Sequence, residues 1–231
     1  MSVTQTSTNA ASGTKCWSCG AAASGHFCAA CGKIQPLPRG TSYFAFFGLP
    51  EKLQIDPEAL EQQFHKLSWK LHPDNFMRAD EFERNLSLER SSELNDAYRA
   101  LRDPLTRVEY LLAHKGMRKE GAAKQQAPPE LLEEVFELNE SLDELREARA
   151  SGEDLAALRA RLESAEKDFQ EKLEEVDAEL DRVRKEWDLA AEAGAAEAER
   201  EKLMARMNEI LNRRSYIRNL VASVAKELAD A

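Results

Sequence analysis

The sequence has little of several features, and each absence excludes a class of protein. No apolar run approaches the length of a membrane-spanning helix. No strongly basic run occurs and the formal net charge is −10, so we expect neither a nucleic-acid partner nor a membrane partner. Aromatic residues make up only 7% of the chain and charged residues 32%, which favours helices with wide solvated faces over sheet.

Sequence motifs of enzymes and of targeting signals are also missing. There is no glycine-rich phosphate loop, and outside the cysteine pairs there is no Cys/His nucleophile arrangement and no convergent acid pair. We therefore expect a protein that is not an enzyme. Residues 1–15 have neither the apolar core of a secretion signal nor the arginines of a mitochondrial presequence, and we expect a disordered N-terminus. A cytoplasmic protein is the simplest interpretation, with a processed protein of the mitochondrial matrix as the alternative.

Cysteine occurs only as two C-x2-C pairs, each leading into a glycine (Gly20 or Gly32). The four thiols are Cys16, Cys19, Cys28 and Cys31. A C-x2-C turn directs two thiolates at one ion, and the glycine lets the backbone fold back with positive φ. Residues 16–35 are too few to bury a useful core, so metal binding would supply the folding energy of this knuckle module. We favour structural Zn²⁺, with iron or an iron–sulfur cluster, or two disulfides, as alternatives.

The tripeptide His72-Pro73-Asp74 follows a predicted helix. Asp56 suits the N-cap and Pro57 the first helical position. The buried stripe of this helix is Leu60, Phe64, Leu67 and Leu71, and its basic residues near the end are Lys66 and Lys70. Because Pro73 cannot continue a helix and biases His72 away from it, the chain should display His72 and Asp74 in an exposed loop.

A second helix, closed by Asp103-Pro104, continues the helical period after this loop. Two antiparallel helices with an exposed His-Pro-Asp loop resemble a J domain, the module that stimulates ATP hydrolysis by DnaK-type chaperones. The aromatic stretch 43–50 is expected to form a short helix that caps the hairpin, and residues 105–113 another short helix. We assign residues 41–116 to this domain and residues 117–128 to a linker.

The remainder, residues 129–231, has three amphipathic segments separated at Gly152 and Gly194. This pattern predicts an antiparallel three-helix bundle or coiled coil. The expected fold class is therefore all-α, with a J-domain hairpin, the C-terminal bundle and a small metal-stapled tetracysteine knuckle module. A homodimer is left open.

One face of the first bundle helix departs from a simple amphipathic pattern. At about 100° of rotation per residue, its core positions cluster, whereas Leu132 and Phe136 point roughly 100–140° away from them. The core positions are Leu131, Val135, Leu138, Leu142 and Leu145, and the acidic residues expected around the exposed pair are Glu133, Glu137, Glu140 and Glu144. In the third helix Tyr216 is also off the core stripe. These residues resemble a binding patch for a partner with a basic rim, although isolated exposed apolar residues are common.

Several sequence pieces together resemble the HscB family, J-type co-chaperones of iron–sulfur cluster biogenesis. They are Phe47-Gly48-Leu49-Pro50, His72-Pro73-Asp74-Asn75-Phe76, Leu101-Arg102-Asp103-Pro104-Leu105-Thr106-Arg107-Val108-Glu109-Tyr110-Leu111-Leu112 and Leu142-Asp143-Glu144-Leu145. The resemblance covers about residues 42–230. The cysteine segment is similar to the extension that some members of the family carry. Glu133 departs from the pattern, because bacterial relatives have an apolar residue at that place.

The resemblance implies two binding sites. His72, Pro73 and Asp74, supported by Lys66 and Lys70, would engage an HscA/DnaK-type chaperone. The site for an IscU-type scaffold protein would consist of Leu132, Phe136, Glu137, Glu140, Glu144 and Tyr216. Two rival functions remain: a general protein-folding J protein, and an iron–sulfur or redox protein that uses the four cysteines.

Overall fold

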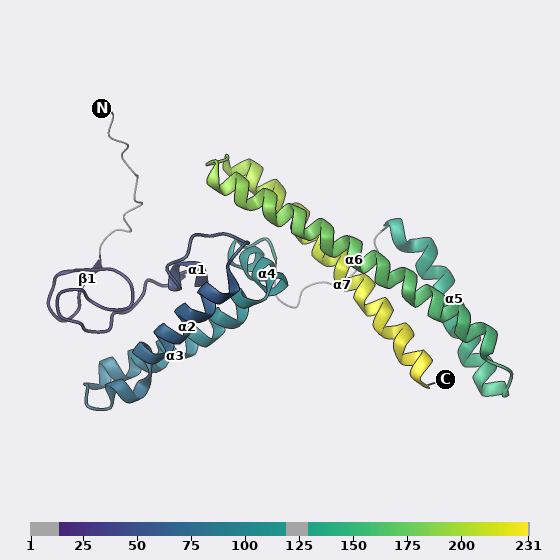
Figure 1. The fold of residues 1–231 in the computed structure, drawn as a ribbon, viewed down its shortest axis with the longest axis horizontal. Coiled ribbons are helices and arrows are strands. Elements are labelled where there is room, and N and C mark those ends of the chain that lie inside the picture. The colour runs from purple at the N-terminus through teal and green to yellow at the C-terminus, as the bar shows by residue number, and fades with distance from the viewer. Residues whose placement is uncertain (1–13, 119–128, 231) are drawn as a thin grey trace. The chain divides into compact units, whose positions relative to one another are not determined.

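The computed structural model describes residues 14–118 and 129–230, and within these residues the fold is helical (Figure 1). The chain forms two compact units, one up to Tyr110 and one from Leu111 onward. The division falls inside α4 (Pro104–His114). The predicted disordered segment 1–15 lies outside the described residues except for residues 14 and 15, and the predicted linker 117–128 does so except for residues 117 and 118. No described helix is long and apolar enough to cross a membrane.

The first unit begins with the cysteine module. Strands β1 (Thr14–Lys15) and β2 (Ala22–Ala23) pair antiparallel around the first cysteine turn. Cys16, Ala23 and Cys28 are buried together and form a small core. The sequence analysis predicted no strands here, because two-residue strands are too short to show an alternating pattern.

The rest of the first unit is the predicted helical hairpin. Helices α2 (Pro57–Leu71) and α3 (Glu81–Arg102) pack against each other, and the short α1 (Tyr43–Phe46) packs on α3. The Asp56 side chain accepts hydrogen bonds from the first turn of α2, as the sequence predicts. The interior contains the apolar stripes of both helices and the aromatic residues of the short helix. Its members are Phe44, Phe46, Phe47, Leu60, Leu67, Leu71, Leu86, Leu94, Ala97 and Leu101.

The second unit contains the predicted three helices. They are α5 (Leu132–Ser151), which the short 3-10 turn η2 (Pro129–Leu131) precedes, α6 (Ala156–Glu192) and α7 (Glu197–Asp230). The pairing of α6 with α7 is the most extensive in the structure, and α5 packs on α6. Figure 1 shows α5 beside only part of the α6–α7 pair, consistent with its 20 residues against their 37 and 34. The all-α fold class is confirmed.

Candidate functional site

The His-Pro-Asp tripeptide forms an exposed turn between α2 and α3. His72 leaves the helix with φ −57° and ψ 131°, and Pro73 opens the 3-10 turn η1 (Pro73–Phe76). The backbone N–H of Asp74 donates to His72 Nδ1 over 3.3 Å, and the Asp74 carboxylate lies 3.5 Å from the same nitrogen. The Asn75 side chain donates to the Trp69 carbonyl over 2.6 Å. These local bonds shape the turn while leaving the His72 and Asp74 side chains more than half exposed.

Two serines of α3 hold the end of α2 at the point where this turn begins. The hydroxyls of Ser87 and Ser91 both donate to the Leu71 carbonyl, over 2.7 and 2.9 Å. A carbonyl in the last turn of a helix has no partner within the helix, so these bonds satisfy it. Ser87 is fully buried. The sequence analysis missed both residues, because a serine inside a helix gives no sign of its tertiary partner.

The basic side of the turn lies on α2. Lys66 and Lys70 are both exposed, one helical turn apart. Trp69, which the sequence analysis did not select, lies between them in sequence and is 76% exposed. An indole this exposed beside two ammonium groups suits a partner surface that combines carboxylates with an apolar spot.

The four cysteines converge on one point. All four sulfur atoms lie within 4.8 Å of one another, with 3.6 Å between those of Cys16 and Cys31 and 3.7 Å between those of Cys19 and Cys28. A tetrahedral ion with metal–sulfur distances of about 2.3 Å separates its ligands by about 3.8 Å, so the thiols fit such an ion. These separations are well beyond the S–S bond of about 2.05 Å in a disulfide.

The backbone around the first cysteine pair is arranged for a thiolate. The N–H groups of Cys19 and Ser18 point at the Cys16 sulfur over 3.5 and 3.4 Å, and against the effect of burial they lower the pKa of Cys16 to about 6. The Lys33 N–H acts to lower the pKa of Cys31, but loss of solvent and the neighbouring sulfurs raise it to about 12. Four thiolates therefore do not coexist here near neutral pH unless a cation neutralises them. Gly20 and Gly32 adopt φ of +73° and +74°, as the spacing predicts.

On the bundle, the rotation predicted for α5 is confirmed. Its five predicted core residues are buried, whereas Leu132 and Phe136 are 54% and 70% exposed. Glu133 lies exposed beside them.

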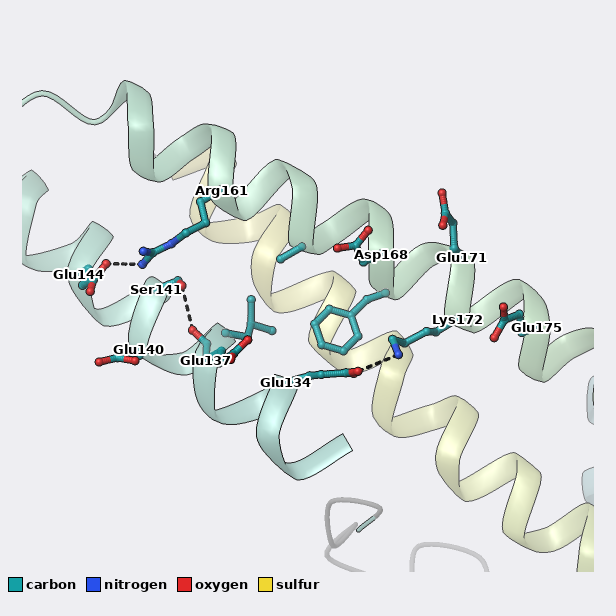
Figure 2. Close-up of a pocket in the computed structure, with 13 residues that line it drawn as sticks. Glu134, Glu137, Glu140, Ser141, Glu144, Arg161, Asp168, Glu171, Lys172 and Glu175 are labelled. Carbon is teal, nitrogen blue, oxygen red and sulfur yellow. Dashed lines mark hydrogen bonds and ion pairs between the residues drawn. The ribbon is translucent and has the colours of Figure 1, made fainter. Parts of the chain in front are cut away.

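The acidic residues Glu137, Glu140 and Glu144 line an open groove of about 710 Å³ between α5 and α6. Figure 2 shows this groove, with Glu144 turned toward Arg161 as its ion-pair partner. At the other end of the groove Lys172 pairs with Glu134 at 2.9 Å. By helical rotation Glu137 and Glu144 lie roughly 80–140° from Leu132 and Phe136, so the predicted site is divided between two flanks of α5.

The second flank of α5 faces α7. Glu130 pairs with Arg213 at 3.5 Å and Arg146 with Glu227 at 2.6 Å, so the two helices run in the same direction. Tyr216 follows Arg213 by three residues, which places it at the level of the first two turns of α5. Its rotation on α7 is within roughly 20° of that of Glu227, which contacts α5. Half-buried Tyr216 therefore lies on the same side of the bundle as Leu132.

A hairpin with an exposed His-Pro-Asp turn, joined to a three-helix bundle, is the arrangement that the resemblance to J-type co-chaperones predicts. A scan against models of known protein families finds no match. A co-chaperone protein HscB homolog from Vibrio vulnificus is 34% identical over 151 residues, which are 65% of this chain and 85% of that protein. An iron–sulfur cluster co-chaperone protein HscB homolog from Arabidopsis thaliana is 36% identical over 133 residues, 58% of this chain and 52% of that one.

The fold is similar to that of a solved structure. The crystal structure of the human co-chaperone protein HscB matches with a TM-score of 0.60 over 93% of this chain and 98% of that one, at 24% identity. The chain belongs to the HscB family of co-chaperones.

Proposed function

We propose that this protein is an adaptor in iron–sulfur cluster assembly. Its bundle binds an IscU-type scaffold protein, and its J domain presents the complex to an HscA/DnaK-type chaperone and stimulates ATP hydrolysis by that chaperone. The observation that carries the proposal is the exposed His72-Pro73-Asp74 turn, in a chain whose bundle exposes Leu132 and Phe136 on a second surface. The name of the Arabidopsis relative supports the link to iron–sulfur clusters.

For the chaperone site, the proposed contacts are His72, Pro73 and Asp74, with Lys66 and Lys70 against an acidic surface. The turn needs no rearrangement before binding, because its own hydrogen bonds already hold it. Preorganisation of this kind lowers the entropy cost of association. In this proposal the protein catalyses no reaction itself.

For the scaffold site, Leu132 and Phe136 are the apolar anchors, with Tyr216 beside them. Exposed aromatic side chains of this kind dominate the binding energy of many interfaces. Glu137 and Glu140 would supply the acidic rim, whereas Glu144 already pairs with Arg161. We therefore expect Glu144 to contribute less than the other two.

Cys16, Cys19, Cys28 and Cys31 would hold Zn²⁺, which supplies the folding energy of the module. The alternative, an iron–sulfur or redox centre at the same thiols, predicts a coloured protein with visible absorption. The zinc assignment predicts a colourless protein that contains one zinc ion per chain.

Single-turnover ATP hydrolysis by a cognate chaperone tests the proposal, with and without an IscU-type scaffold. We expect strong stimulation only when the scaffold is present, no stimulation with His72→Gln, and loss of the scaffold dependence with Phe136→Ala plus Tyr216→Ala. Leu189→Ala is the matched control, because Leu189 is also an exposed apolar residue of the bundle, at 65%. Equal stimulation without scaffold would favour a general protein-folding J protein, and no stimulation at all would contradict the J-domain assignment.

A further inference from the structure

The cysteine module is docked on the start of α3. Lys33 forms an ion pair with Glu83, which is only 4% exposed. The Trp17 ring packs edge-on against Phe82, with 4.8 Å between ring centroids. A third contact, farther along the hairpin, joins His26 to α1: its Nε2 donates to the Phe46 carbonyl over 2.8 Å.

The two residues that reach α3 belong to the metal-binding turns themselves. Trp17 lies between the cysteines of the first pair, and its Nε1 donates to the Ile34 carbonyl over 2.7 Å. The Lys33 carbonyl accepts the N–H of Cys28 over 2.9 Å, within the second turn. Both side chains are therefore positioned only when the two cysteine turns are folded around their ion.

The same stretch of α3 continues to the His-Pro-Asp turn. Ser87 follows Glu83 by one helical turn and Ser91 by two, and both hydroxyls bond to the Leu71 carbonyl, which directly precedes His72. An unbroken series of contacts thus runs from the cysteine turns through Lys33 and Glu83 to the residue before His72. Contiguous contacts of this kind can transmit coupling when one end has two discrete states.

The cysteine module has two such states. Its own core cluster is small, with Cys16, Ala23 and Cys28 as its buried members, so we expect the module to be folded with the ion and unfolded without it. When it unfolds, Lys33 leaves Glu83, and the first turn of α3 loses both this ion pair and the contact between Trp17 and Phe82. Loss of both contacts removes stabilisation from the start of α3, so this part of the helix should loosen.

We propose that the tetracysteine site is a control site, at which metal occupancy sets the affinity of the His-Pro-Asp turn for the chaperone. The effect on chaperone affinity rests on the proposed function. The coupling between the cysteine site and the turn does not, because it can be measured on the protein alone. By linkage, chaperone binding must raise the affinity for Zn²⁺ by the same factor.

The test compares full-length protein loaded with Zn²⁺ and the same protein stripped by a chelator. We expect stripping to speed amide exchange across residues 72–91 and to weaken chaperone binding, each by about fivefold or more. Exchange in α5–α7 should stay unchanged. Equal exchange at residues 72–91 in both forms would overturn the coupling. If amide exchange changes but the Zn²⁺-loaded protein shows no measurable chaperone binding, the proposed function is contradicted. The proposed control of chaperone affinity by the metal is then contradicted as well.

Variants on the J-domain side leave the metal ligands intact. Phe82→Ala plus Glu83→Gln should retain one Zn²⁺ per chain yet show no response to stripping at residues 72–91. Glu81→Gln, an exposed carboxylate of the same turn, is the matched control and should respond like the unaltered protein. The double variant could loosen α3 for other reasons, and a charge exchange distinguishes this case. Glu83→Lys alone should abolish the effect of Zn²⁺ removal on amide exchange at residues 72–91, and Lys33→Glu plus Glu83→Lys should restore that effect. A double variant that still responds to Zn²⁺ would refute this route.

Discussion

The Leu71 carbonyl offers the sharpest quantitative test of how the His-Pro-Asp turn is held. It accepts hydrogen bonds from two hydroxyls, Ser87 at 2.7 Å and Ser91 at 2.9 Å. A single hydrogen bond contributes about 1 kcal/mol to stability, so Ser87→Ala and Ser91→Ala should each cost about 1 kcal/mol. Either variant leaves the carbonyl one partner.

The double variant removes both partners and adds the desolvation penalty of an unsatisfied buried carbonyl, about 1–3 kcal/mol. We therefore expect a loss of about 3–5 kcal/mol, more than the sum of the two single losses. Such non-additivity is the sign of two residues that share one partner.

Native-state hydrogen exchange of the α2 and α3 amides in the full chain measures this free energy without assuming two-state unfolding of both units. Ser92→Ala is the matched control, because Ser92 is exposed on the same helix. Losses that merely add, or a double variant no worse than either single one, would refute the reasoning. The double variant should also stimulate the chaperone less, since His72 directly follows the released carbonyl.

Three further predictions concern the surfaces and the bundle. Phe136→Ala should weaken scaffold binding by about 1–2 kcal/mol, roughly 5- to 30-fold, in calorimetric titration; an unchanged affinity would contradict the anchor role. Lys66→Gln plus Lys70→Gln should weaken chaperone binding and flatten its salt dependence, because both ammonium groups are exposed; a salt dependence equal to that of the unaltered protein would argue against it. The Arg146 guanidinium, assisted by Arg149, lowers the pKa of Glu227, so the stability from this carboxylate is present above about pH 4.3 and is lost as the pH falls through the lowered pKa. The protection of the amides at the end of α7, measured as their exchange rate relative to the intrinsic rate at each pH, should therefore fall in acid, and Glu227→Gln should remove that loss of protection; a variant that still loses protection would place the response elsewhere.

Local physical rules were enough to predict the main helices and the exposed turn. Pro73 ends α2 and Asp56 begins it for reasons contained within a few residues. The exposure of Leu132 and Phe136 likewise follows from rotation around one helix, which needs no knowledge of the neighbours.

The contacts between segments distant in sequence could not be predicted in this way. Ser87 bonds to a carbonyl 16 residues earlier, and Glu83 pairs with Lys33, 50 residues away. The acidic residues of α5 were expected to surround the exposed apolar pair, but three of them line the groove toward α6, where Glu144 meets Arg161. Which residues meet depends on how the helices pack, and periodicity within one helix does not contain that information.

The 50-residue separation between Lys33 and Glu83 has a consequence for the order of folding. Synthesis proceeds from the N-terminus, so the cysteine turns are complete before any residue of α3 exists. They can take up their ion and fold early, because all their ligands lie within 16 residues. When α3 is synthesised, its first turns meet the surface of the folded cysteine module. The packing of α3 against α2 can then start with this end of α3 already held in place. A chain made without metal lacks this template, so its J domain should fold more slowly even where its final helices are the same.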